Sequence, residues 1–275
     1  MHVHRRALLG ILGLAAVGAL GSGYLVGSGV LGPPPVAPKG VGQPRSAPRP
    51  FPKGFALPPH FLPPNLERHA APRRTITELP GEGTAVALTV DDGISTEVVA
   101  AYAKFALDTG MRLTFFLNGI RPSWTDNAPA LRPLVASGQV QLANHTWSHP
   151  DLTQLSRQQI ADELMRNHDF IGNTYGVDAR PYFRPPYGYH NHHVVEAAES
   201  VGYTVPVLWY GSLSDASEIS DADLMASATS WLLAQHIVIG HANYPTVTRH
   251  FDEIVAIIRS RGLVPVTLDD YFLRP

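Results

Sequence analysis

The chain of 275 residues contains no cysteine. This absence excludes disulfide bonds, thiolate zinc sites and a cysteine nucleophile, so any bound metal has to be held by histidine and carboxylate groups. Residues 1–64 also lack Asp and Glu but contain six Lys and Arg residues, whereas the remainder has 15 basic and 23 acidic residues. The remainder therefore lacks the basic excess that is typical of proteins that bind nucleic acid.

Residues 1–32 have the pattern of an export signal or a membrane anchor. Arg5 and Arg6 precede an uncharged run from Ala7 to Gly32, in the order of a basic head and an apolar stretch. The paired arginines are similar to a twin-arginine signal. Eight glycines in the run argue against a buried core helix. We expect the protein to be exported, and either secreted after cleavage or anchored to the membrane.

Residues 33–74 are predicted to be a proline-rich linker. Twelve of the 25 prolines lie between residues 33 and 64, and such a segment favours extended conformations. Its four basic residues could contact anionic cell-wall polymers or lipid head groups, but a solvated spacer is the preferred interpretation of this composition.

Residues 75–275 are predicted to form a single catalytic domain of the α/β class. The expected strands are 84–90, 112–117, 140–143, 182–184, 204–209, 236–240 and 263–267. The expected helices are 96–107, 128–136, 157–175, 193–199, 221–234 and 247–261. This alternation predicts a parallel sheet with helices outside it, and about seven such units in roughly 200 residues favour a small barrel.

Polar residues gather where these strands are predicted to end, which is the edge that carries reactive groups in parallel α/β folds. The set consists of Asp91, Asp92, His145, His149, Arg184, Tyr187, Asp215 and His241. His145 and His149 are four residues apart, but Pro150 disfavours a helix there and indicates a loop. Two histidines and a carboxylate, with a position left for water, are a common catalytic zinc arrangement.

In their order, these segments resemble the motifs of the polysaccharide deacetylase family, also called carbohydrate esterase family 4, over residues 80–270. The motif T-F-D-D-G corresponds to residues 89–93, H-[ST]-x-x-H to residues 145–149, R-x-P-Y-G to residues 184–188, and L-x-H to residues 239–241. The D-W pair corresponds to Asp215 and Ala216, so the family's tryptophan is missing.

The resemblance implies a distorted (β/α) barrel that removes acetyl groups from polymeric sugars with a divalent metal, most often zinc, with cobalt or another divalent ion as alternatives. It implies that Asp92, His145 and His149 bind the metal and that Asp91 is the general base. By the same resemblance, Arg184 holds Asp91, and the Tyr187 N–H stabilises the oxyanion. His241 would protonate the leaving group, with Asp215 orienting its imidazole.

Three functions follow from this pattern as hypotheses. The first is an exported metal-dependent hydrolase that removes N-acetyl groups from a cell-surface polysaccharide, such as an N-acetylglucosamine polymer of the peptidoglycan or chitin type. The second is an O-acetyl esterase acting on xylan or another sugar polymer. The third is a catalytically impaired glycan-binding barrel, which only Ala216 supports.

Two further groups of side chains leave alternatives open. His190, His192 and His193 could indicate a second metal site, but a solvated helix start is the preferred interpretation. The aromatic residues near the motifs could stack on sugar rings or pack in the core, and the sequence does not distinguish these uses. They are Trp147, Tyr187, Tyr189, Trp209 and Tyr244.

Overall fold

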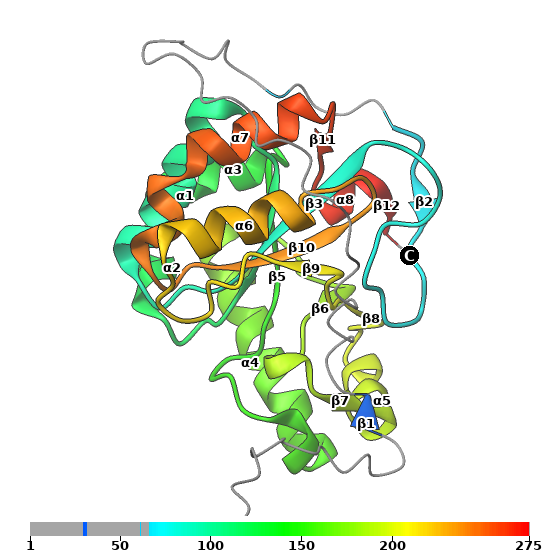
Figure 1. Cartoon of the computed structure of the whole chain (residues 1–275). Helices are drawn as coiled ribbons and strands as arrows, with labels where there is room; N and C mark the ends of the chain where they lie inside the picture. Colours follow the sequence, from blue (N-terminus) through cyan, green and yellow to red (C-terminus); the bar gives the residue numbers. More distant parts are fainter. Residues whose placement is uncertain (1–29, 32–60, 62–65, 275) are drawn as a thin grey trace, which may run out of the picture.

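Figure 1 shows the fold as a computed structural model, which describes residues 30–31, 61 and 66–274. The predicted export signal and most of the predicted linker lie outside the described residues. Within the described part of the chain, no helix is long and apolar enough to cross a membrane.

The elements alternate along the chain. The strands are β1 (Val30–Leu31), β2 (His69–Ala70), β3 (Ala85–Asp92), β4 (Leu113–Leu117), β5 (Val140–Asn144), β6 (Tyr182–Phe183), β7 (His190–Asn191), β8 (Val205–Pro206), β9 (Gly211–Ser212), β10 (Ile237–His241), β11 (Val264–Pro265) and β12 (Phe272–Leu273). The helices are α1 (Thr96–Thr109), α2 (Pro122–Asp126), α3 (Ala128–Ala136), α4 (Arg157–Tyr175), α5 (His192–Ser200), α6 (Asp221–Trp231), α7 (Phe251–Ser260) and α8 (Leu268–Tyr271), with short 3-10 helices η1 (Leu152–Gln154), η2 (Pro186–Gly188) and η3 (Pro245–Arg249).

The main sheet is a curled parallel sheet in the order β8-β6-β5-β4-β3-β10-β9, with β11 paired to the first residues of β3. Every pair in it is parallel, so all the carboxyl ends of its strands face the same way. Helices lie on its outer side, with α1, α3 and α7 grouped together and α4 beside α5 (Figure 1). The predicted distorted (β/α) barrel is confirmed.

The two faces of β3 show how the sequence builds this architecture. Successive strand residues point to opposite sides. Val86, Leu88 and Val90 therefore pack in the hydrophobic cluster shared with the helices. Ala85 and Ala87 face the barrel interior, where they join a second cluster that includes Phe116, Tyr182 and Ile237. All eight residues of β3 are buried. A strand that is covered on both faces needs an almost continuous apolar sequence, and β3 has one up to its two carboxylates.

Helix ends follow local sequence signals. Ser95 accepts a hydrogen bond from the Val98 N–H at the start of α1, and Ser156 forms a capping box with Gln159 at the start of α4. Both helices end at a glycine with a left-handed backbone. These caps fix where each helix begins and therefore where the preceding strand-to-helix loop must turn.

The barrel is closed by a short segment of irregular chain. The strands β8 and β9 are the two edges of the sheet, and only residues 207–210 separate them in the sequence. We call the junction between these two edges the seam. Ile76 lies beside Val207 in the seam, and the Leu79 N–H donates to the carbonyl of Gln235. Both Ile76 and Leu79 are buried, so the segment before β3 completes the barrel wall.

Most predicted elements are present, with two informative differences. The strand predicted at 204–209 is present only as the shorter β8, at residues 205–206, with an isolated bridge at Val207. The unpredicted β9 follows at the opposite edge of the sheet. The helix predicted to reach residue 234 ends at Trp231. At the end of the predicted linker, β2 pairs in parallel with β12.

Candidate functional site

The side chains singled out in the sequence come together at the carboxyl ends of the strands. Asp91 and Asp92 end β3, and His145 and His149 lie in the loop after β5. Arg184 follows β6, Asp215 follows β9, and His241 ends β10. Five segments that are far apart in the sequence therefore meet at one rim of the barrel.

Asp92, His145 and His149 form the group of potential metal ligands found in the described residues, with their ligand atoms within 4.8 Å of one another. The Oδ1 atom of Asp92 lies 3.5 Å from Nε2 of His145 and 3.4 Å from Nε2 of His149. A tetrahedral zinc ion with bonds of about 2.0–2.1 Å places its ligand atoms about 3.3 Å apart. The donor set and its spacing therefore fit a divalent metal of the zinc type.

The loop that carries the two histidines is held in an unusual conformation. Thr146 and His149 both have positive φ angles, of 68° and 64°. The side chain of Asn144 accepts a hydrogen bond from the Thr146 N–H, and the hydroxyl of Thr146 accepts one from the His149 N–H. Residues 145–149 are not helical, so the loop predicted from Pro150 is confirmed. Hydrogen bonds, rather than helix geometry, bring the imidazoles together.

Arg184 is fully buried and binds the first carboxylate of the pair. Its Nη1 lies 2.5 Å from Oδ1 of Asp91, and its Nη2 donates to the hydroxyl of Thr89. The remaining guanidinium hydrogen bonds go to the carbonyls of Val207 and Leu208. Burial lowers the pKa of Arg184, an effect that the charge of Asp91 opposes. Paired in this way, Asp91 is oriented and its charge is balanced.

Backbone contacts orient the histidines of the candidate metal site as well. Nδ1 of His145 lies 2.8 Å from the carbonyl of Arg184, which can only accept, so this nitrogen carries the proton and leaves Nε2 free for a metal. Burial lowers the pKa of His149 to about 4, and the charge that His145 carries when it is protonated on both nitrogens acts in the same direction. His149 is therefore neutral near pH 7, the form that can bind a metal.

Burial would raise the pKa of Asp92, but the hydrogen bond and the charge of His145 outweigh it and hold the pKa well below its usual range. Asp92 is consequently ionised at neutral pH. Its backbone carbonyl accepts a hydrogen bond from the indole of Trp124, and its own φ of 71° turns it out of the strand alternation. Asp92 thus shares His145 with Asp91 but also contacts His149, whereas Asp91 is bound by Arg184.

His241 and Asp215 form a second pair on the same rim. Nδ1 of His241 lies 3.0 Å from Oδ1 of Asp215, and the His241 N–H donates to Oδ2 of the same carboxylate. Burial lowers the pKa of His241, but the hydrogen bond with Asp215 and the charge of Asp91 outweigh it, so the pKa is raised. Ala216, which stands where the resemblance expects a tryptophan, is exposed.

Tyr187 lies in η2 with a φ of 60°. Its ring centroid is 4.6 Å from that of His149, and its side chain is 55% exposed. Tyr244 is also exposed, whereas Trp147 packs against Arg166 and Trp209 faces Arg184. Among the aromatic residues considered for sugar contacts, Tyr187 and Tyr244 are exposed, whereas Trp147, Tyr189 and Trp209 are half-buried.

The predicted solvated histidine cluster is wrong for His190. This side chain is fully buried, with Nδ1 at 3.1 Å from the carbonyl of Gly188 and Nε2 at 3.0 Å from the hydroxyl of Thr75. His193 contacts the carbonyl of Leu155, and His192 pairs with Glu196. The three imidazoles have separate partners and do not form a metal site among the described residues.

Sequence reasoning also missed Asn243, which donates a hydrogen bond of 2.7 Å to Oδ2 of Asp92. Its position two residues after His241 was the available signal, because a polar side chain at a strand end shares the rim with its neighbours.

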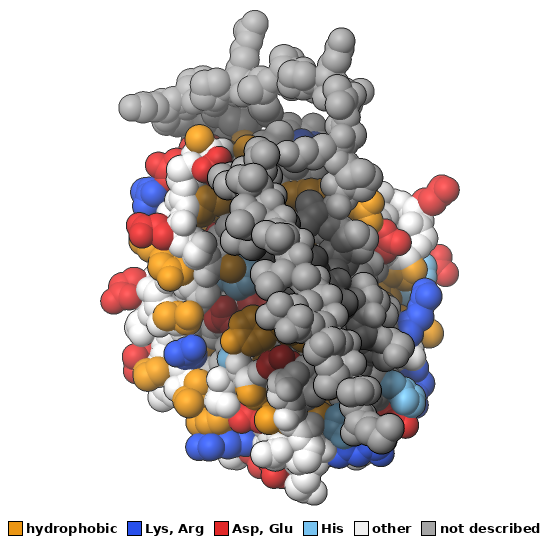
Figure 2. Space-filling view, turned by 60° about the horizontal axis from the view of Figure 1, so that its bottom comes forward, with side chains coloured by type: hydrophobic (Ala, Val, Ile, Leu, Met, Phe, Trp, Pro, Cys, Tyr) orange, Lys and Arg blue, Asp and Glu red, His pale blue; other side chains and the backbone are white. Residues whose placement is uncertain are grey.

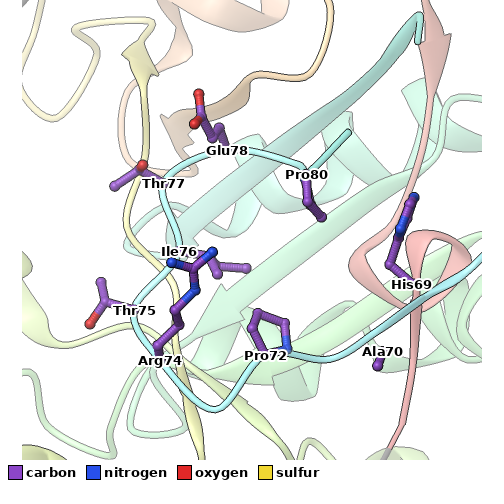
Figure 3. Close-up of a pocket in the computed structure, with 9 residues that line it drawn as sticks. All are labelled: His69, Ala70, Pro72, Arg74, Thr75, Ile76, Thr77, Glu78 and Pro80. Atoms are coloured by element: carbon purple, nitrogen blue, oxygen red, sulfur yellow. The ribbon is translucent and has the colours of Figure 1, made fainter. Parts of the chain in front are cut away.

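A pocket of about 470 Å³ lies apart from these residues. It is lined by the segment from His69 to Pro80, which Figure 3 shows as one continuous stretch of chain. None of the side chains at the rim contributes to this pocket, and none of the candidate metal ligands lines it. We therefore place the chemistry at the rim and not in the pocket. Figure 2 shows lysine and arginine side chains scattered over one face of the molecule rather than gathered in a basic patch.

Comparisons with known proteins agree with this geometry. The profile of the family Polysaccharide deacetylase matches residues 79–206. The bifunctional xylanase/xylan deacetylase of Cellvibrio japonicus is 28% identical over 67% of this chain and 27% of its own length. The peptidoglycan-N-acetylglucosamine deacetylase PgdA of Listeria monocytogenes is 27% identical over 68% of this chain and 38% of its own length. The chain thus spans well under half of these curated relatives.

Among solved structures, a pseudoenzyme of carbohydrate esterase family 4 from Bacillus anthracis has the same fold. The TM-score is 0.63 at 20% identity, and the alignment covers 72% of this chain and 70% of that one. At this identity the likeness shows a shared fold.

Proposed function

This chain belongs to the polysaccharide deacetylase family, and we propose that it is an exported, metal-dependent hydrolase that removes N-acetyl groups from a cell-surface polysaccharide. The observation that carries the proposal is the arrangement of Asp92, His145 and His149 around one point, with Asp91 and His241 beside it. We infer that the substrate is an N-acetylglucosamine polymer of the peptidoglycan or chitin type.

Asp92, His145 and His149 would hold the metal, most simply zinc. When bound, a divalent ion supplies a water of lowered pKa and polarises the acetyl carbonyl. Oδ2 of Asp91 lies 3.5 Å from Nε2 of His145 and so faces the metal site, whereas Oδ1 is bound to Arg184. Asp91 would therefore use Oδ2 as the general base that takes the proton from the attacking water.

Tyr187 and His241 would act on the substrate rather than on the attacking water. The backbone N–H of Tyr187, in the rigid turn after Pro186, would donate to the oxygen of the tetrahedral intermediate. His241 would give its proton to the leaving nitrogen. Asp215 binds Nδ1 of His241, so the proton for transfer is on Nε2, and the raised pKa keeps His241 charged to a higher pH.

Apolar side chains at the rim support a sugar polymer as substrate. Ile94, Tyr187 and Tyr244 are between 37% and 55% exposed, and each lies within a few residues of a strand end that carries site residues. Such side chains match the apolar faces of pyranose rings, since a ring can stack on them while its hydroxyls stay in water.

The test measures acetate release from N-acetylglucosamine oligomers by protein freed of metal and then supplied with zinc, cobalt or a chelator. We expect the protein to release acetate only when metal is supplied. In Asp91→Asn the rate of acetate release should fall about 10²- to 10⁴-fold. Asp162→Asn, on the exposed side of α4, is the matched control and should behave as the wild type. Full activity of Asp91→Asn would exclude Asp91 as the general base.

A second candidate, an O-acetyl esterase, is favoured by the relative that is a xylan deacetylase. The same groups would serve, because both reactions pass through a tetrahedral oxyanion. Side-by-side assays on N-acetylated and O-acetylated oligosaccharides distinguish the two by the ratio of kcat/KM values.

A third candidate, a glycan-binding barrel without turnover, is favoured by Ala216 and by the fold shared with a pseudoenzyme. Binding of these oligosaccharides with no acetate released at saturating zinc would support it over both hydrolases.

Export is proposed from Arg5, Arg6 and the uncharged run that follows. Cell fractionation of the full chain and of the Arg5→Lys, Arg6→Lys double variant tests it. We expect the wild type outside the cytoplasm and the double variant retained inside.

A further inference from the structure

Each carboxylate of the adjacent pair has one oxygen bound to a donor and the other directed to the histidines. In Asp91, Arg184 binds Oδ1 while Oδ2 faces His145. In Asp92, the amide of Asn243 binds Oδ2 at 2.7 Å, while Oδ1 lies 3.4–3.5 Å from His145 and His149. The two acids are therefore oriented in parallel ways by two different donors.

Asn243 is itself fixed at both ends of its side chain. Its Oδ1 accepts a hydrogen bond of 3.2 Å from the Ile94 N–H, and its side chain is buried. Because a backbone N–H can only donate, the atom facing Ile94 must be the amide oxygen, and the amide nitrogen must face Asp92. The assignment of the two amide atoms is therefore unambiguous.

The backbone on either side of Asn243 is tied to the same loop. The Ala242 N–H donates to the carbonyl of Asp91, and the Ser95 N–H donates to the carbonyl of Ala242. The chain that follows β10 thus runs alongside residues 91–95 and cannot move independently of them. Asn243 is held in place by its surroundings before any metal binds.

We propose that Asn243 is a positioning residue for the metal ligand Asp92, and that by occupying Oδ2 it makes the carboxylate bind the cation through Oδ1 alone. The inference rests on the proposed metal site but not on the proposed reaction. A neutral amide suits this role because it orients the carboxylate without cancelling the charge that attracts the cation. The guanidinium on Asp91, by contrast, balances the charge of a group that binds no metal.

The experiment measures zinc affinity, by competition with a chelator at fixed pH, in the wild type and in Asn243→Ala and Asn243→Leu. We expect the Kd for zinc to rise about 10- to 100-fold in both variants. The visible spectrum of the cobalt-loaded protein should change too, since the ligand geometry changes. A merely structural role would move neither quantity in protein that remains folded.

Asn127→Ala is the matched control. Asn127 also uses its amide nitrogen for hydrogen bonds, 3.0 Å to the carbonyls of Thr96 and Ser123, but touches none of the metal ligands. It should lose stability with an unchanged zinc Kd. Wild-type zinc affinity, within twofold, and an unchanged cobalt spectrum in folded Asn243 variants would overturn the proposal.

Should neither Asn243 variant fold, the wild type decides. The side-chain amide resonances of Asn243, assigned in labelled protein, should shift as zinc is added, and resonances that stay fixed would refute the proposal. Because these readouts need no substrate, a protein that binds zinc as expected but releases no acetate would refute the proposed function and leave this inference standing.

Discussion

Asp91 and Asp92 are neighbours in the sequence whose side chains have different environments. Asp91 continues the inward row of Ala85, Ala87 and Thr89 along β3 and is bound by Arg184 inside the mouth of the barrel. Asp92 has a positive φ and turns toward His145 and His149. Two like charges can stand side by side here because each has its own compensating partners.

Replacing Arg184 by methionine should destabilise the protein strongly. The change leaves the buried charge of Asp91 unpaired and the carbonyls of Val207 and Leu208 without their donor. We expect a loss of about 3–5 kcal/mol in the free energy of unfolding, measured with urea on metal-free protein.

Arg180→Met is the control for this prediction. Arg180 pairs with Asp178, and both side chains are more than 40% exposed, so its loss should cost at most about 1 kcal/mol. Equal losses in the two variants would contradict the role assigned to burial.

Replacing Asp215 by asparagine should shift the pH dependence of activity. The pKa of His241 is raised, because the hydrogen bond with Asp215 and the charge of Asp91 outweigh the lowering by burial. Without the Asp215 charge the pKa of His241 falls, so His241 loses its acidic proton at lower pH. We expect the alkaline limb of kcat/KM to move to lower pH, as measured between about pH 5 and 10.

The same shift has a stability consequence with a definite sign. A raised histidine pKa contributes stability that is fully present below the unfolded pKa of about 6.5 and is lost as the pH rises through the folded value. In Asp215→Asn this part of the pH dependence of unfolding should shrink. An alkaline limb and an unfolding profile identical to those of the wild type would exclude His241 as the acid.

Residues with short motifs around them could be predicted from the sequence, whereas residues defined by distant partners could not. Asn243 contacts a carboxylate 151 positions away, and His190 contacts Thr75 at a separation of 115. The position of Asn243 just after β10 indicates the rim but not the carboxylate that it binds, and nothing near His190 in the sequence indicates Thr75. The polar run around His190 favoured exposure, but pairing with Thr75 and the Gly188 carbonyl allows its burial.

At the scale of elements, strained loops rather than strands shape the site. Positive φ angles at residues other than glycine occur at Asp92, Thr146, His149, Tyr187 and Ser214, all in or beside the site, and elsewhere in the described chain at Gln235. Such conformations cost energy and persist where hydrogen bonds impose them. Periodicity located the strands and helices but carries no information on these loop conformations.

Replacing Gly93 by alanine should disturb the loop that carries Asp92. Gly93 has a φ of +92°, and a Cβ atom there would lie 2.4 Å from Nε1 of Trp124, the atom that donates to the Asp92 carbonyl. Alanine must therefore displace this indole. We expect a loss of unfolding free energy about 1–3 kcal/mol larger than that caused by backbone strain alone, and a higher Kd for zinc.

Gly262→Ala measures the strain alone, because Gly262 has a φ of +61° and a methyl group added there would meet no atom within 4 Å. It should cost about 1 kcal/mol and leave zinc affinity unchanged. If Gly93→Ala behaved like Gly262→Ala in both measurements, the contact with Trp124 would not position Asp92.

At the scale of the whole molecule, the sheet is a barrel because its two edges are joined. Alternation of strands and helices predicted a parallel barrel, since each connection needs a helix outside the sheet. The closure was not predictable in the same way. Residues 204–209 have the pattern of one strand, yet only residues 205–206 pair, with β6, as β8. The next strand, β9 at 211–212, pairs with β10 at the opposite edge, and Ile76 lies beside Val207 between the two.

The seam also connects to the site. The Leu208 N–H donates to the carbonyl of Ile76, and the Leu208 carbonyl accepts from Arg184, which binds Asp91. We therefore expect that a chain beginning at Phe61 keeps its stability and zinc affinity, whereas a chain beginning at Gly81 loses both. Removing Ile76 and Leu79 from the core should cost about 3–6 kcal/mol, at about 1.5–3 kcal/mol for each buried side chain.

Urea unfolding and zinc competition on the two truncated chains measure these losses. The full-length Ile76→Ala, Leu79→Ala double variant separates packing from hydrogen bonding, because it empties the seam but keeps the backbone bonds of Ile76 and Leu79. This variant should show most of the loss in unfolding free energy that the chain beginning at Gly81 shows. Its zinc affinity should fall less, since Leu208 stays bound to Ile76. If the chain beginning at Gly81 matched the chain beginning at Phe61 in both measurements, the barrel would be closed without residues 76–79 and their link to Arg184 would carry no energy.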